Sequence, residues 1–167
     1  MDFLGEFFGT MYCWFETFFG LDLANYMWGG ALETTDGAAH FQSEGNMFVV
    51  VGITMCLISL FTFTLFYYIV NHPKLNHWWG WLIFWISNGV INLIVGWSWT
   101  LSHLNSGEMN VIETASGSEI SPDDYINSTD CFCFGISNMV LALIFMFAFS
   151  MLFKWWSSNC SKAPFVK

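Results

Sequence analysis

Positive charge is scarce in this sequence. Its 167 residues include four lysines and no arginine, against 13 aspartates and glutamates, so the formal net charge is -9. Proteins that bind nucleic acids neutralise phosphates with clustered lysine and arginine. The sequence contains no such cluster, which excludes nucleic acid as a partner.

Charged side chains of either sign are also few. They make up 10% of the chain, whereas hydrophobic residues make up 55% and aromatic residues 20%. A soluble domain typically carries about 25% charged residues, which it needs to cover its surface. The composition therefore predicts an all-α integral membrane protein whose surface faces the lipid bilayer.

Three uncharged runs are long enough to cross a bilayer. Residues 47–70, 78–101 and 134–153 contain no Asp, Glu, Lys or Arg. A transmembrane helix needs about 20 predominantly apolar residues. Tryptophan and tyrosine, which favour the headgroup level, stand at the ends of these runs. We therefore expect three transmembrane helices in a multi-pass protein.

The lysines indicate how the predicted spans are oriented. Lys74 lies in the connector 71–77, and the other three lysines lie in the tail 154–167. Lysine and arginine favour the cytoplasmic side, so we expect the connector and the C-terminus there. The segment 102–133 is then an acidic loop on the outer side, and 29–46 is a polar linker.

Residues 1–28 form an N-terminal segment with the pattern of an amphipathic helix. Large apolar residues recur at helical spacing, and the opposite face carries Gly5, Glu6, Gly9 and Glu16. One interpretation is a helix lying in the membrane interface. The other is a fourth span that packs through Gly5 and Gly9. Repeated around the axis of an oligomer, Glu6 and Glu16 would attract cations at a pore mouth.

Polar and small residues on the predicted spans are candidates for pore lining or helix packing. Asn88 and Asn92 are four residues apart and share a helix face, with Gly96 near it. Amides buried in lipid need partners, so they either bond between helices or line a pore. The other two spans carry further residues suited to helix contact, at Gly52, Cys56, Ser59 and Asn138.

The five cysteines include one close pair, Cys131 and Cys133, on the predicted outer side. An oxidising exterior could form a disulfide there, but positions two apart suit disulfide geometry poorly, so structural or free thiols are the first expectation and the disulfide the alternative. A metal site would need more ligands than the histidines on that side supply. The chain also lacks the motifs of phosphate loops, serine hydrolases and metalloproteases. We therefore expect no cofactor, no metal and no enzymatic activity.

Two functional hypotheses follow from these features. The first is a self-assembling membrane protein that forms a homo-oligomeric pore or ion channel, based on the acidic N-terminal segment and on Asn88 and Asn92. The second is a non-catalytic integral subunit of a larger membrane complex, based on the packing residues and the missing catalytic motifs. The native oligomeric state distinguishes the two.

Overall fold

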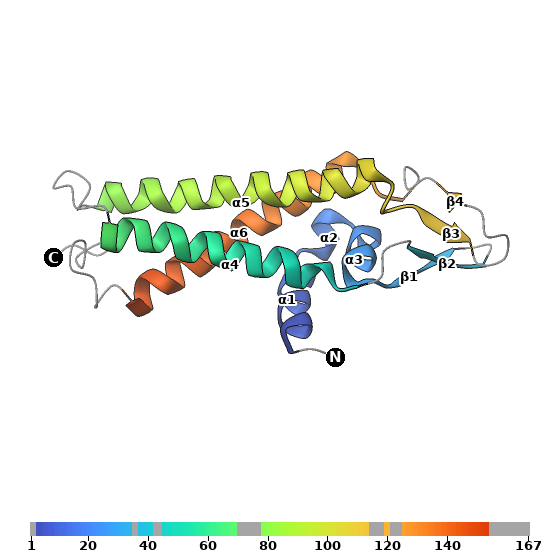
Figure 1. Cartoon of the computed structure of the whole chain (residues 1–167), viewed down its shortest axis with the longest axis horizontal. Helices are drawn as coiled ribbons and strands as arrows, with labels where there is room; N and C mark the ends of the chain where they lie inside the picture. The colour runs from blue at the N-terminus through green and yellow to red at the C-terminus, as the bar shows by residue number, and fades with distance from the viewer. Residues whose placement is uncertain are drawn as a thin grey trace. The chain divides into compact units, whose positions relative to one another are not determined.

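The chain forms two compact units in the computed structural model (Figure 1). Unit 1 contains residues 1–52 and 94–137, and unit 2 contains residues 53–93 and 138–167. The predicted connector 71–77 and tail 154–167 lie outside the described residues. The residues that the structure describes are 3–34, 37–41, 45–69, 78–113, 119–120 and 125–153.

Three long helices correspond to the three predicted spans. They are α4 (Met47–Thr64), which continues as the π-helical turn η1 (Leu65–Ile69), α5 (Trp78–Ser106) and α6 (Ser128–Phe153). The shortest, α4 with η1, has 23 residues. At about 1.5 Å per residue it covers more than the roughly 30 Å of a bilayer core. The expectation of three helices long and apolar enough to cross a membrane is therefore confirmed.

Two of these helices extend beyond the predicted spans. α5 continues past the predicted end at 101 to Ser106, and α6 begins at Ser128 rather than at 134. An uncharged run marks only the apolar part of a helix. The helix itself continues into polar sequence for as long as its backbone groups are satisfied.

A capping box explains the early start of α6. The side-chain oxygen of Asn127 accepts hydrogen bonds from the backbone N–H groups of Thr129 (2.8 Å) and Asp130 (3.2 Å). In return, the Asp130 carboxylate accepts one from the backbone N–H of Asn127 (3.0 Å). These bonds satisfy end groups that the first turn leaves open.

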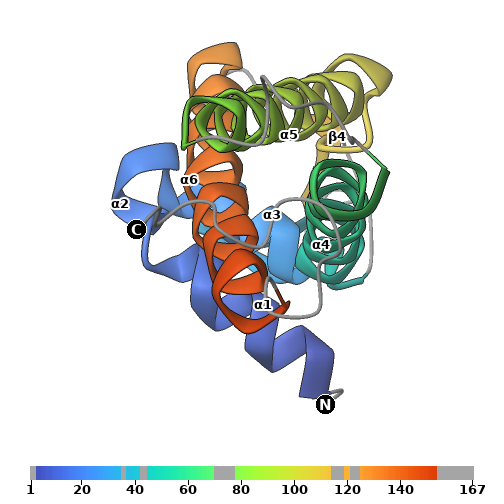
Figure 2. The same ribbon diagram turned by 90° about the vertical axis from the view of Figure 1, so that its left-hand side faces the viewer.

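Unit 2 is a bundle of segments from the three long helices, which lie side by side (Figure 2). Its aromatic core contains Phe63, Phe66, Tyr67 and Trp81, all buried. The ring centroids of Phe63 and Tyr67 are 4.8 Å apart, and those of Phe66 and Tyr67 are 4.9 Å apart. Phe149 of α6 packs against this cluster. Aromatic packing thus joins α4, α5 and α6 in this unit.

The N-terminal segment in unit 1 is divided into three short helices. They are α1 (Phe3–Cys13), α2 (Glu16–Phe19) and α3 (Leu21–Trp28). Gly20 separates α2 from α3 with a φ of +95°, a conformation that favours glycine. The longest helix, α1, has 11 residues and covers about 16 Å, half of a bilayer core. The expected single helix over 1–28 is thus corrected, and none of its three parts is long enough for a fourth span.

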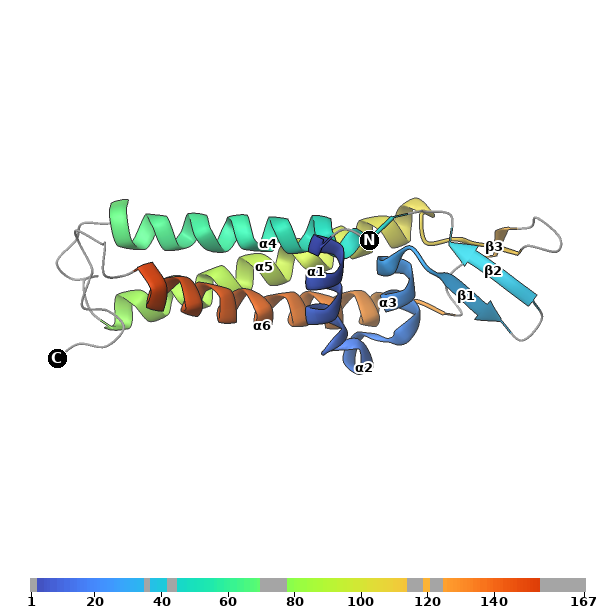
Figure 3. The ribbon, with the colours of Figure 1, turned by 90° about the horizontal axis from the view of Figure 1, so that it is seen from below.

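Helix α1 runs across the first turns of α4 rather than along them (Figures 1 and 3). Tyr12 of α1 stacks with Phe48 of α4 and with Phe134 of α6, at centroid distances of 5.2 and 5.3 Å. All three rings are buried. Phe8 packs onto Gly52, where a Cβ atom would stand 2.3 Å from the Phe8 ring. Apolar contacts therefore hold α1 crosswise in unit 1.

A small antiparallel sheet completes unit 1 and corrects the all-α expectation. Its strands pair in the order β1 (Ala31–Thr34), β2 (Gly37–Phe41), β3 (Val111–Glu113) and β4 (Glu119–Ile120). These strands lie in the segments for which the sequence predicted only a polar linker and an acidic loop. Strands of two to five residues are too short to show an alternating pattern. The pairing of β2 with β3 also joins residues far apart in the chain.

Candidate functional site

A row of polar side chains, which we call the polar face of α5, runs along this helix in unit 2. Trp81, Trp85, Asn88 and Asn92 follow one another at spacings of four, three and four residues. This spacing places them on one side of a helix. Asn88 and Asn92 are fully buried. The candidate asparagines therefore face the interior of the chain.

Both tryptophans of the polar face donate hydrogen bonds to α6. Trp81 Nε1–H donates to Ser150 Oγ over 3.1 Å, and Trp85 Nε1–H donates to the carbonyl oxygen of Leu143 over 2.9 Å. The two indole rings are stacked, with centroids 5.5 Å apart. Each indole thus packs its ring in the bundle and satisfies its only donor.

Asn88 joins all three long helices. Its Nδ2 donates to Ser59 Oγ of α4 and to the carbonyl oxygen of Ala142 of α6, in both cases over 3.1 Å. Ser59 and Ala142 are fully buried as well. The Asn88 amide therefore uses both protons inside the bundle. Two candidates that the sequence placed on different spans, Asn88 and Ser59, contact each other directly.

Asn92 makes a second set of bonds and leaves one acceptor unmatched. Its Nδ2 donates to the backbone oxygen (2.9 Å) and to Oδ1 (3.2 Å) of Asn88. The backbone oxygen of Asn92 accepts a bond from Asn138 Nδ2 (2.7 Å). Asn92 Oδ1 is buried and has no hydrogen-bond partner among the described residues. Flipping the amide would only bring oxygen against the two Asn88 oxygens, so the orientation is fixed by the network.

Gly89 is the contact glycine of α5, and the sequence interpretation missed it. A Cβ atom there would stand 2.9 Å from Leu143 Cδ2 and 3.1 Å from Met139 Cγ of α6. The only feature of the sequence that could have pointed to Gly89 is its position next to Asn88. Gly96, the glycine chosen from the sequence, is buried in unit 1, where its carbonyl accepts a hydrogen bond from Thr100 (3.0 Å). Gly89 therefore allows the close approach of α6 in unit 2.

The packing residues expected on the first span serve different contacts. Gly52 receives Phe8 in unit 1, and Ser59 accepts the bond from Asn88 in unit 2. Cys56 is half-buried and its thiol is free. The contacts shown for these residues are thus those of Gly52 with Phe8 and of Ser59 with Asn88.

The N-terminal glycines and acids lie on different faces of α1, contrary to the sequence interpretation. Gly5 and Gly9 are buried, and Glu6 is exposed. Asn46 Nδ2 donates to the Gly5 carbonyl (3.4 Å), and the Trp28 ring covers Gly9 so closely that a Cβ atom would stand 2.1 Å from it. The physical reason is that the glycines admit neighbouring side chains and turn inward, while Glu6 turns outward. Glu16 lies on α2 and is half-buried.

The described cysteines are all free thiols. Cys131 is buried and Cys133 is half-buried, both on the first turns of α6. Residues two apart on a helix point to nearly opposite sides, which is the geometric reason that these two thiols do not pair in the structure. Cys13 accepts a hydrogen bond from Trp28 Nε1–H over 3.3 Å. Burial raises the pKa of the Cys13 thiol, which keeps it protonated and weakly reactive.

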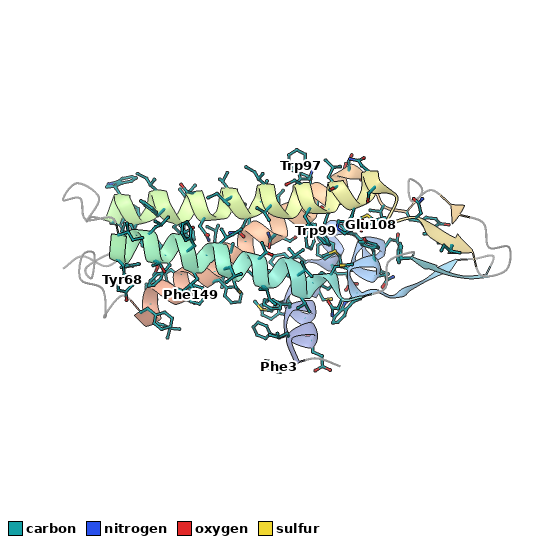
Figure 4. The ribbon with its side chains drawn as sticks, viewed as in Figure 1. Phe3, Tyr68, Trp97, Trp99, Glu108 and Phe149 are labelled. Atoms are coloured by element: carbon teal, nitrogen blue, oxygen red, sulfur yellow. The ribbon has the colours of Figure 1, made fainter. Side chains whose placement is uncertain are left out.

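His103 is the centre of a polar cluster in unit 1. Its Nδ1 lies 2.9 Å from the Tyr26 hydroxyl and 2.6 Å from Glu108 Oε2, and Trp99 packs on its ring at a centroid distance of 3.9 Å (Figure 4). Unprotonated Nδ1 accepts from the Tyr26 O–H group, whereas protonated Nδ1 donates to Glu108. The cluster joins α3 to the end of α5.

Two carboxylates approach each other where α3 and α6 begin. Burial, and then the negative charge of Asp130, raise the pKa of the Asp22 carboxyl above its usual range. A Cβ atom on Gly20 would also lie 3.8 Å from the Asp130 carboxyl carbon. The described residues contain no group of three histidine, cysteine, aspartate or glutamate side chains that could hold a metal ion.

Comparison with known proteins adds no further constraint. No protein-family model, no curated protein and no solved structure matches this chain. The function is therefore argued from the geometry of the polar face of α5 and from the surfaces of the two units.

Proposed function

We propose that this chain is a non-catalytic integral membrane protein that serves as a subunit of a larger membrane complex. One observation carries the proposal: polar and small residues of the three long helices contact one another within a single chain. Asn88 bonds to Ser59 and Ala142, and Gly89 admits α6. Spans that line a pore or bind other spans keep such residues on their outer surface.

The outward surface of the spans supports contact with lipid. In the middle of the three helices the exposed side chains are almost all large and apolar, and only Ser87, Ser98 and Ala148 are small. The Ser98 hydroxyl donates to the Ile94 carbonyl, which satisfies it without a partner chain. Representative outward residues are Leu57, Phe61, Ile83, Val90, Ile144 and Leu152.

Unit 1 offers the surfaces that suit a partner. The exposed face of α1 carries Phe3 and Phe7 beside Glu6. Strands β1 and β4 each have one neighbour in the described sheet, and such edges accept a further strand from another protein. We therefore assign partner contact to unit 1 and lipid contact to the spans.

A homo-oligomeric pore is the second candidate. The observation that favours it is the exposed Glu6 carboxylate on α1, which would form an acidic ring around a symmetry axis. Asn88 and Asn92 would contribute little to such a pore, because both are fully buried in the single chain.

The oligomeric state tests the two candidates. We expect the chain, purified in mild detergent, to have a protein mass of one 19.2 kDa copy by light scattering and to produce no ion flux in liposomes. A discrete homo-oligomer with ion flux that falls in Glu6→Gln would instead establish the pore.

We also propose that the connector 71–77 and the tail 154–167 are cytoplasmic and that the outer segment 102–133 is not. The support is the location of all four lysines in the connector and the tail. Asn127-Ser128-Thr129 fits the pattern for N-linked glycosylation, and Asn127 is exposed. This acceptor lies in the segment assigned to the outer side.

Glycosylation in microsomes tests this orientation. Ser116→Asn creates a second acceptor in the segment 102–133, away from the helix ends, and Asn159→Gln removes the acceptor pattern at Asn159 in the tail. We expect Ser116→Asn to add one glycan and Asn159→Gln to change nothing. A glycan that disappears in Asn159→Gln would reverse the orientation.

A further inference from the structure

His103, near the C-terminal end of α5 in unit 1, brings two hydrogen-bond partners to one nitrogen atom. Its Nδ1 lies 2.9 Å from the Tyr26 hydroxyl of α3 and 2.6 Å from Glu108 Oε2, in the turn that follows α5. A ring nitrogen accepts a hydrogen bond only while it carries no proton, and it donates one only when it carries a proton. The bond from the Tyr26 O–H group and the bond to the Glu108 carboxylate therefore require different protonation states of the same atom.

The two partners of His103 differ in their exposure to water. Tyr26 is fully buried, the His103 side chain is 18% exposed and the Glu108 side chain is 51% exposed. Trp99, one turn earlier on α5, packs on the imidazole at a centroid distance of 3.9 Å and holds the ring between the two partners (Figure 4). Protons from water can therefore reach the ring while unit 1 stays folded.

The imidazole is the group in this cluster that responds to neutral and mildly acidic pH. Among the described side chains, Tyr26 and Glu108 are the titratable groups that contact His103. Asp22 of α3 and Asp130 of α6 interact with each other instead. Tyrosine ordinarily keeps its proton at neutral pH and glutamate ordinarily loses it, whereas histidine changes its charge between about pH 5 and pH 8.

We propose that His103 is a proton-operated switch for the attachment of α3 to the end of α5. At high pH the Nδ1 atom has no proton and accepts the bond from Tyr26, which joins two residues 77 positions apart in the chain. At low pH the Nδ1 atom is protonated and donates to Glu108, in the turn next to it. Acidification thus exchanges a long-range bond for a local one and loosens α3 from α5.

Nitrogen-15 NMR of the histidine rings tests the first part of this proposal on the full chain in mild detergent. At pH 8 we expect the His103 ring to carry its proton on Nε2, with Nδ1 bare. At about pH 5.5 we expect protons on both nitrogens. The chain has four histidines, and the signals that disappear in His103→Gln identify this ring. A proton on Nδ1 at pH 8 would overturn the proposal.

Hydrogen–deuterium exchange of the backbone amides of α3 (Leu21–Trp28) tests the second part. After correction for the intrinsic exchange rate, we expect about fivefold less protection at pH 5.5 than at pH 8, as for the loss of one hydrogen bond. Tyr26→Phe keeps the ring and removes the hydroxyl, so its α3 protection should be low at both pH values. His103→Gln cannot titrate, so its α3 protection should not depend on pH.

His72→Gln, in the connector 71–77, is the matched control because it removes a different histidine. We expect it to keep the full pH response of α3, and an unchanged helix content by circular dichroism verifies the fold of each variant. A pH response that persists in Tyr26→Phe or in His103→Gln would refute the switch. None of these results bears on the subunit proposal, which the mass and flux measurements decide separately.

Discussion

Asn88→Ala is expected to lower the free energy of unfolding by about 2 kcal/mol, whereas Asn92→Ala is expected to lower it by less than about 1 kcal/mol. Asn88 makes three side-chain hydrogen bonds, to Ser59, Ala142 and Asn92. Each interhelical bond of this kind contributes on average about 0.6 kcal/mol in a membrane protein. Denaturation with sodium dodecyl sulfate in mixed micelles measures both variants.

The contrast arises from the unmatched acceptor of Asn92. Its Oδ1 is buried without a partner, at a cost of about 1–3 kcal/mol for such a group. Removing the Asn92 amide relieves that cost, which offsets the two bonds that are lost to Asn88 and the loss of the donor to the buried Asn88 Oδ1. The two substitutions delete the same atoms, so the loss of side-chain volume is matched between them.

Ser87→Ala, on the outward face of α5, provides the baseline for this comparison. It should change the free energy of unfolding by less than about 0.5 kcal/mol. Equal losses in Asn88→Ala and Asn92→Ala would contradict the bonding pattern that the structure assigns to the polar face of α5. A larger loss in Asn92→Ala would show that Asn92 Oδ1 has a bound partner, such as an internal water.

Gly52→Leu is expected to lower the free energy of unfolding by about 3 kcal/mol, through loss of the contact between α1 and α4. A Cβ atom on Gly52 would stand 2.3 Å from Phe8 Cδ1 and 2.5 Å from Phe8 Cγ. Phe8 is only 4% exposed, so the ring has little room to move. Thermal unfolding followed by circular dichroism measures the loss.

A double-mutant cycle separates this clash from a general effect of a larger side chain. In Gly52→Leu with Phe8→Ala, the added leucine enters the space that the ring has left. The double variant should therefore be more stable than the sum of the single losses predicts. Val50→Leu, on the exposed side of α4, is the matched control and should be nearly neutral. Strict additivity of the two single losses would refute the contact.

The three long helices followed from composition because their cause is local. Within α4, α5 and α6, long stretches carry no charge, and a single stretch of sequence is enough to reveal this. The pairing of Asn88 with Asn92 on one helix face was also predictable, since spacing alone decides it. Their burial was one of two alternatives that spacing leaves open.

The partners of these residues were not predictable from the same pattern. Asn88 bonds to Ser59 of α4 and to Ala142 of α6, which lie far apart in the chain. Gly89 rather than Gly96 admits α6 in unit 2, because the choice depends on which turn of α6 passes closest. A single helix pattern contains no information on that crossing.

The structure of the N-terminal segment was likewise only partly predictable from the sequence. Its apolar spacing indicated helix, but Gly20, with a φ of +95°, separates α2 from α3. The inward turn of Gly5 and Gly9 follows from the fit of Asn46 and Trp28 against them. The sheet formed by β1 to β4 depends on pairing between distant short strands, which no local pattern records.

The sequence by itself determined that this chain has three helices long and apolar enough for a bilayer, because length and lack of charge are properties of continuous segments. Only the tertiary structure decided where the polar groups of those helices point. An amide on a helix face can bond to a neighbour or line a pore, and the position of Ser59 and Ala142 beside Asn88 makes it an internal contact. The tertiary structure likewise turned Glu6 outward and the glycines inward, since the space beside Gly5 and Gly9 is occupied by side chains from elsewhere in the chain.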